Sequence, residues 1–184
     1  MTRTHQPSAA ADAPRLRRAY FESRFGQLHV HNAIPAGGGF DEATTLLCIH
    51  SKTTTGRVFG AVLPLLGVTR SVYAPDLPGR GESDGPSGET PAAQAAEGML
   101  DFIDSMRFRR LDVLGAGSGA AIAIELALER PQVVRRVVLL DPDAQLRDER
   151  RRLVNQPVLV AKVGVDQLQS APQLVFDQLS ALLR

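Results

Sequence analysis

The sequence lacks tryptophan, has a single cysteine and contains no apolar run that approaches the ~18 residues of a membrane-spanning helix. The cysteine, Cys48, lies within the apolar run LLCI at 46–49. One cysteine excludes an internal disulfide framework, so we expect a small buried side chain in a reducing, cytoplasmic environment. The formal net charge of +1 is far from the basic excess of a dedicated nucleic-acid-binding protein. We therefore expect neither a nucleic-acid partner nor a membrane partner.

The N-terminal segment also lacks an apolar core of the kind that a secretory signal carries. Residues 1–18 are rich in proline, alanine and serine and show no hydrophobic periodicity, which is typical of a disordered tail. The remaining residues, 19–184, are expected to form one domain.

What the chain does contain is a series of short apolar runs, each followed by a turn or a helical pattern. Buried strands are predicted at 45–50, 71–76, 111–115 and 136–141. A hairpin around Gly26 precedes them. Strands that alternate with helices predict a parallel, doubly wound α/β sheet, in which ligands bind at the carboxyl ends of the strands. Those ends carry His50, Asp76, the GAGSGA turn at 115–120 and Asp141.

Four segments in this order resemble the α/β-hydrolase superfamily, over about residues 20–142. They are LLCIHS, VYAPDLPGRGESDGP, LDVLGAGSGAAIAIELALERP and VRRVVLLDP. The resemblance implies a mostly parallel sheet of the α/β-hydrolase type, a nucleophile elbow after LDVL and an oxyanion loop after LLCI.

The elbow departs from the G-x-S-x-G pattern of that superfamily. Aligned by its glycines, the turn places Gly117 at the nucleophile position and Ser118 one residue later. A register shifted by one residue would instead present Ser118 as the nucleophile. The oxyanion loop reads His50-Ser51-Lys52, and together these features resemble a subset of the superfamily with a non-serine elbow.

A serine nucleophile needs a histidine base, which follows the elbow in this superfamily. All four histidines of the chain, at 5, 29, 31 and 50, precede it. The acid has two candidates, Asp141 and Asp166. We expect the sheet to lack its last strand and helix, and the charged segment 144–155 is too short for a full lid. The chain is then a shortened non-hydrolytic member, the product of a truncated gene, or a protein that takes its base from a partner chain.

The remaining polar residues have simpler readings. His50 is expected to brace the oxyanion loop, and Lys52 either places a cation over the site or is an ordinary solvated lysine. Asp76 and Arg80 resemble the structural turn of the superfamily. His29 and His31 share one face of a strand, but two histidines alone do not make a metal site, so we expect no metal and no cofactor.

Two functions remain open. The first is a hydrolase of a small, ester-like substrate with a degenerate site formed by Ser118 and the 50–52 loop. The alternative is an inactive or non-hydrolytic member that binds a small molecule or a partner chain in the same crevice. A homodimer that covers the exposed sheet edge would suit either function.

Overall fold

The computed structural model describes residues 13–38, 44–142, 146, 153 and 156–183. Its centre is one seven-stranded sheet with the strand order β1-β2-β4-β3-β5-β6-β7. The strands are β1 (Arg15–Ser23), β2 (Gly26–Ile34), β3 (Thr45–Ile49), β4 (Val72–Pro75), β5 (Leu111–Ala116), β6 (Val134–Leu140) and β7 (Val158–Ala161). Only the β1–β2 and β2–β4 pairs are antiparallel among these strands. The mostly parallel sheet predicted from the sequence is therefore confirmed.

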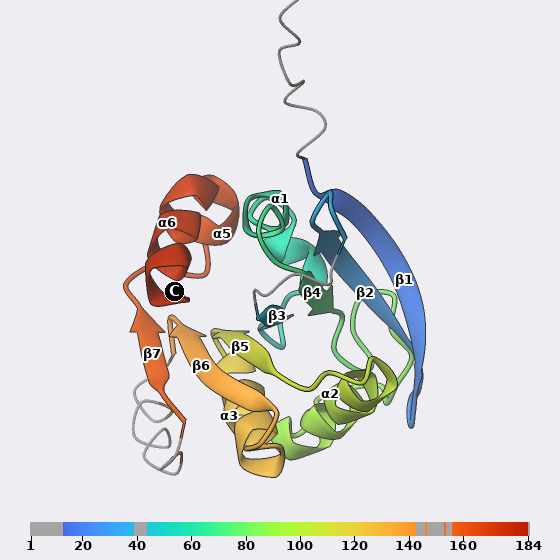
Figure 1. Cartoon of the computed structure of the whole chain (residues 1–184). Coiled ribbons are helices and arrows are strands. Elements are labelled where there is room, and N and C mark those ends of the chain that lie inside the picture. The colour runs from blue at the N-terminus through green and yellow to red at the C-terminus, as the bar shows by residue number, and fades with distance from the viewer. Residues whose placement is uncertain (1–12, 39–43, 143–145, 147–152, 154–155, 184) are drawn as a thin grey trace, which may run out of the picture.

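Helices cover both faces of the sheet (Figure 1). One face packs against α2 (Ala92–Ser105) and α3 (Gly119–Glu129), and the other against η1 (Gly56–Phe59), α1 (Leu63–Leu66), α5 (Gln167–Ser170) and α6 (Pro172–Leu182). Each face has its own apolar cluster, with Phe102 and Ile122 fully buried in the first and Phe59 and Leu179 in the second. None of the helices in the described ranges combines the length and the hydrophobicity needed to cross a bilayer.

The central strands are continuous apolar runs because both of their faces are covered. Every residue of β5 is buried, including Asp112, whose side chain is 0% exposed. The Asp112 carboxylate accepts two hydrogen bonds from the Arg135 guanidinium, at 2.9 and 2.6 Å. Arg70 and Arg136 approach the same carboxylate at 3.9 and 3.5 Å. A buried carboxylate is tolerated in this strand because it is paired with charge.

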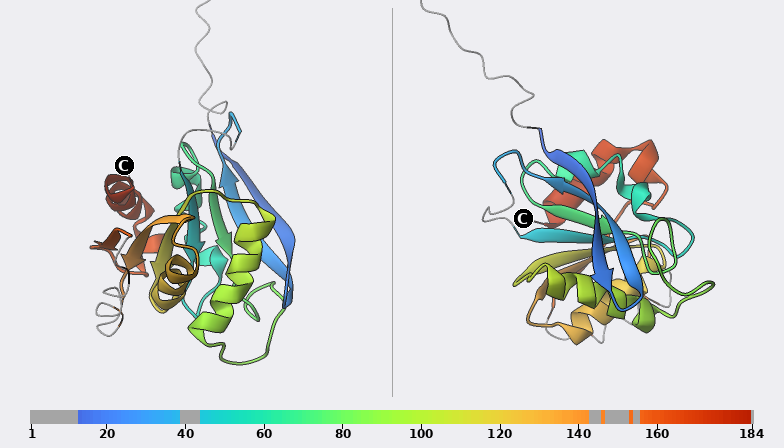
Figure 2. Two further views of the ribbon diagram at one scale, coloured as in Figure 1. Left: turned by 60° about the horizontal axis from the view of Figure 1, so that its bottom comes forward. Right: turned by 90° about the vertical axis from the view of Figure 1, so that its right-hand side faces the viewer.

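The hairpin at the N-terminal edge begins earlier than expected. Strand β1 starts at Arg15, which lies opposite Ile34 of β2, so residues 15–18 belong to the sheet and not to a tail. Composition did not reveal this segment because its strand character comes from backbone pairing with β2 and not from an apolar run. Residues 1–12 of the expected tail lie outside the described residues. Figure 2 shows the β1–β2 ribbon along this edge of the sheet.

The carboxyl ends of β3, β4, β5 and β6 meet at one edge of the sheet, where the sequence predicted a site. Strand β7 is the last strand in the sheet order, so among the described residues its outer side is a lateral, unpaired edge of the sheet. The homodimer that would cover an edge stays a prediction. Apart from Leu146 and Leu153, the charged segment 144–155 lies outside the described residues.

Candidate active site

The 115–120 turn joins β5 to α3 through two glycines that allow the helix to touch the sheet. A Cβ added at Gly115 would lie 2.6 Å from the Cα of Ala120. A Cβ added at Gly119 would lie 2.5 Å from the carbonyl oxygen of His50. Both distances are too short for real side chains, so glycine at these positions is what permits α3 to begin directly on β5 and β3.

Gly117 lies at the tip of the turn and has a left-handed backbone, with φ of +54°. Its N–H donates to the carbonyl of Leu140, at 2.9 Å, which ties the tip to the end of β6. In contrast to its neighbours, Gly117 has room for a Cβ, which would lie 3.4 Å from the Ser51 side chain and 3.6 Å from that of Val165. The tip is therefore a strained position that has space for a small side chain but carries none.

The hydroxyl of Ser118 points to the 50–52 loop. Its Oγ accepts a hydrogen bond from the backbone N–H of Lys52, at 2.9 Å, and lies 2.9 Å from the Oγ of Ser51. The structure thus brings together Ser51, Lys52, Gly117 and Ser118, as the sequence predicted. It adds a contact that the sequence did not reveal, because the Ser118 hydroxyl oxygen accepts the hydrogen bond of the Lys52 N–H in the 50–52 loop.

His50 is fully buried and both of its ring nitrogens have partners. Nε2 accepts from the N–H of Leu77, at 2.9 Å, so the proton must lie on Nδ1, which donates to the carbonyl of Ser51, at 2.7 Å. Burial lowers the pKa of His50 below its usual value, and the Ser51 carbonyl opposes this shift only in part. A neutral ring with both nitrogens engaged braces the loop and leaves no lone pair to activate Ser118.

Lys52 forms an ion pair at the surface. Its Nζ lies 3.0 Å from Oε1 of Glu89, whose side chain is 77% exposed, and this contact lowers the pKa of the Glu89 carboxyl. Beside Lys52 is a cavity of only about 10 Å³, bordered by Leu77, Arg80 and Ile122. That volume suits about one water molecule.

The two candidate acids lie near this end of the sheet but are not hydrogen-bonded to Ser118 in the part of the chain that the structure describes. Asp141 directly follows β6, is exposed and has a φ of +52°. Asp166 is also exposed and precedes α5, next to Val165, which packs near Gly117. Within the described residues, the Ser118 hydroxyl is hydrogen-bonded to Ser51 and Lys52, and neither carboxylate is among its partners.

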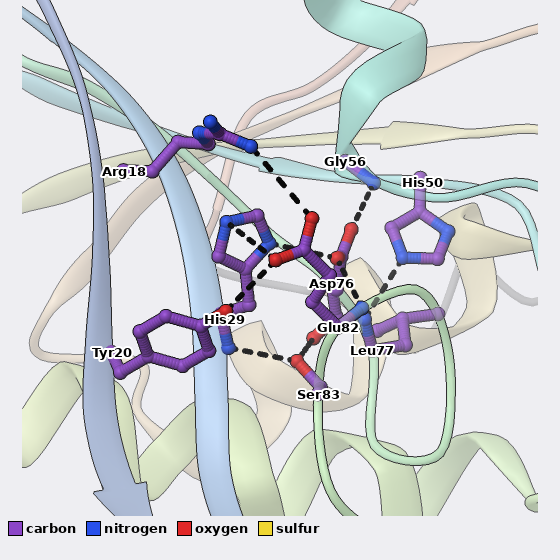
Figure 3. Close-up of polar contacts among 9 residues, drawn as sticks. All are labelled: Arg18, Tyr20, His29, His50, Gly56, Asp76, Leu77, Glu82 and Ser83. Carbon is purple, nitrogen blue, oxygen red and sulfur yellow. Dashed lines mark hydrogen bonds and ion pairs between the residues drawn. The ribbon is translucent and has the colours of Figure 1, made fainter.

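A second polar cluster is centred on Asp76 (Figure 3). The buried Asp76 carboxylate accepts from the N–H groups of Gly56, at 2.6 Å, and Glu82, at 3.0 Å, and lies 3.0 Å from Nδ1 of His29. Burial alone would raise the pKa of Asp76, but these bonds from Glu82, His29 and Gly56 lower it overall. The structural role expected for Asp76 fits these contacts. Its pairing with His29 was missed, because only strand pairing brings the two residues together.

The chain is similar in sequence to known proteins. The profile of the alpha/beta hydrolase family matches residues 34–182, and the chain belongs to this family. It is 30% identical over 103 residues to an uncharacterized protein of Mycobacterium tuberculosis, which covers 56% of this chain and 30% of that protein. It is 31% identical over 142 residues to lipase LipV of the same species, which covers 76% of this chain and 51% of the lipase. The matched part of the chain thus spans between about a third and about half of the length of these relatives.

Solved structures agree on the fold. The epoxide hydrolase CorEH superimposes with a TM-score of 0.62 at 20% identity, over 70% of this chain and 43% of the hydrolase. At this level of identity the likeness shows the fold alone, so the chemistry of the chain must be argued from its own residues.

Proposed function

We propose that the 115–120 turn is the nucleophile elbow of the family with Gly117 at the nucleophile position, and that the chain binds a small polar organic molecule without hydrolysing it. The observation that carries this proposal is the Ser118 hydroxyl, which is engaged by the Lys52 N–H while the tip of the turn has no side chain. The alignment by glycines is favoured over the shifted register, because Gly117 and not Ser118 has the left-handed backbone of the turn's tip.

Covalent catalysis by Ser118 would need a base to remove its proton. The closest side-chain partner is another hydroxyl, that of Ser51, which is not basic near neutral pH. His50 uses both ring nitrogens elsewhere, and residues 119–184 contain no histidine. The residues of this chain therefore supply neither an activated serine nor the imidazole that would activate it.

The same groups suit non-covalent binding of an oxygen-rich ligand. The Ser51 and Ser118 hydroxyls lie beside the first turn of α3, where backbone N–H groups and the helix dipole favour a partial negative charge. Among the residues that the structure describes, the Lys52 ammonium pairs with the exposed Glu89, and such surface pairs contribute little stability. Lys52 can therefore exchange Glu89 for a carboxylate or carbonyl group of a ligand. We infer that the ligand is a small carboxylate or carbonyl compound.

A second candidate is a hydrolase of a small ester-like substrate, and the relatives support it. Besides LipV, a 2-hydroxymuconate semialdehyde hydrolase of Pseudomonas putida is 36% identical over 73 residues, covering 39% of this chain and 26% of that enzyme. In this alternative Ser118 is the nucleophile, Asp141 or Asp166 is the acid, and a partner chain supplies the base.

Ester hydrolysis separates the two candidates. We expect the wild-type chain and Ser118→Ala to release p-nitrophenol from p-nitrophenyl acetate and butyrate at the same background rate, because no residue activates the hydroxyl. The exposed Ser105, the last residue of α2 and not part of the candidate site, provides the matched control Ser105→Ala. In the same samples, titration with butyrate should shift the amide resonances of Lys52 and Ser118. A rate that falls about tenfold or more in Ser118→Ala alone would favour the hydrolase.

A further inference from the structure

His29 and His31 lie on the same face of β2. The carboxylate of Asp76, which follows the neighbouring strand β4, lies close to both rings. The two rings are 4.6 Å apart between centroids, at an angle of 76°. Strand β4 pairs with β2 so that Asp76, directly after β4, donates its N–H to the carbonyl of His29, at 2.8 Å. One potential ligand atom from each of His29, His31 and Asp76 lies within 4.8 Å of the other two. The sheet thus supplies the third ligand that the sequence did not reveal.

One buried ring nitrogen of His29 lacks a hydrogen-bond partner among the described residues. The side chain is 1% exposed, and its Nε2 has no hydrogen-bond partner among the described residues. If the proton is on Nδ1, facing Asp76, then the lone pair of the buried Nε2 faces Oε2 of Glu82, at 4.0 Å. Two electron-rich atoms then face each other, with the imidazole nitrogen shielded from water.

We propose that His29 Nδ1, Asp76 Oδ2 and one ring nitrogen of His31 bind a divalent cation of the zinc type. Metal on Nδ1 places the ring proton on Nε2, so that an N–H and not a lone pair faces the Glu82 carboxylate 4.0 Å away, and the repulsion at the buried nitrogen is replaced by attraction. The 3.0 Å between Nδ1 and Oδ2 is close to the roughly 3.4 Å that separates two ligands of a tetrahedral zinc ion. Two imidazoles and one carboxylate select zinc or a similar transition metal over magnesium or calcium.

The surroundings hold these ligands in place. Asp76 is oriented by the N–H groups of Gly56 and Glu82, and Glu82 is itself hydrogen-bonded by the Tyr20 hydroxyl, at 2.8 Å (Figure 3). Outer partners of this kind fix the orientation of metal ligands and the tautomer of a ligating histidine. His31 also borders a cavity of about 260 Å³ that opens to solvent. Of the three proposed ligands, His31 is the one that lines this cavity, so a metal ion would enter from the His31 side.

The test is zinc binding by the full, tag-free chain. Competition with a chromophoric chelator should show one equivalent of zinc bound, and cobalt should give the visible absorption of a tetrahedral site. At a hundredfold excess of free zinc over the dissociation constant, the Tm should rise by about 5–10 °C relative to the chain in EDTA. His31→Gln should weaken zinc binding about tenfold or more. His5→Gln, which also removes one imidazole, should not weaken it.

A protonated His29 that bridges Asp76 and Glu82 is the competing account of the same geometry. Nitrogen NMR of the rings separates the two accounts, since zinc should leave a proton on Nε2 alone. Failure of the wild-type chain to bind zinc, or equal loss of binding in His5→Gln and His31→Gln, would overturn the proposal. The wild-type measurements stand even if His31→Gln does not fold. The outcome does not depend on ester hydrolysis, so this proposal and the proposed function fail separately.

Discussion

Gly119→Ala is expected to destabilise the chain by about 3 kcal/mol or more, although alanine is the better helix former. A Cβ at this position would lie 2.5 Å from the carbonyl oxygen of His50 and 2.6 Å from that of Ile49. Both atoms belong to the backbone of β3 and its following loop, so they move only if α3 separates from the sheet. Chemical denaturation in urea measures the loss, with Cm and m fitted together.

Gly117→Ala is the matched control two residues away. The atoms nearest to its Cβ would be those of the Ser51 and Val165 side chains, at 3.4 Å or more. The remaining cost is that of placing alanine in the left-handed conformation of Gly117, with φ of +54°, which lowers the free energy of unfolding by about 1–2 kcal/mol. We therefore expect the glycine at the tip to tolerate alanine far better than Gly119. The reverse order of the two effects would show that the turn is not placed as described.

Asp76→Ala is expected to cost about 3–5 kcal/mol of stability at neutral pH. The substitution leaves the buried N–H of Gly56 and the part-buried N–H of Glu82 without their acceptor and removes the partner of His29. Asp84 offers a control, because it also accepts a backbone N–H, from Gln27, at 2.9 Å, but is exposed. Asp84→Ala should cost less than about 1 kcal/mol in the same urea titration.

The cost of Asp76→Ala should also depend on pH. The folded-state pKa of Asp76 is lowered, so its carboxylate contributes full stability above the unfolded-state pKa of about 3.9 and loses it as the pH falls through the folded-state value. Urea titrations from about pH 7 to about pH 2.5 should therefore show the gap between wild type and Asp76→Ala narrowing once the pH falls below about 3.9. A gap that stays constant over this range would mean that the charge of Asp76 contributes nothing.

The strands of the sheet were predictable from the sequence because they are short apolar runs between turns. Strand β3 begins at Thr45, as the run TLLCIH indicates, and β5 begins at Leu111. Strand β1 was located only in part, since Arg15–Arg18 carry no apolar pattern and owe their conformation to pairing with β2. Local sequence cannot reveal a segment whose structure depends on its partner.

The site was predictable in position but not in its contacts. The ends of the strands and the glycines of the turn located Gly117, Ser118 and the 50–52 loop. The bond between Ser118 and the Lys52 N–H joins residues that are far apart in sequence, and the role that we propose for the hydroxyl rests on it. The His29–Asp76 pair is hidden for the same reason. The signal that could have found it is an HxH pair on a strand followed by an acid at the end of a neighbouring strand.

The central claim is that Ser118 is a hydrogen-bonded hydroxyl and not an activated nucleophile. Fluorophosphonates react covalently with activated serines, because only a deprotonated oxygen attacks their phosphorus at a useful rate. The most direct measurement is the intact mass of the chain after incubation with a fluorophosphonate, under conditions that fully label a reference serine hydrolase. The account predicts an unchanged mass. A single adduct that peptide mapping assigns to Ser118, and that is absent in Ser118→Ala, would contradict it.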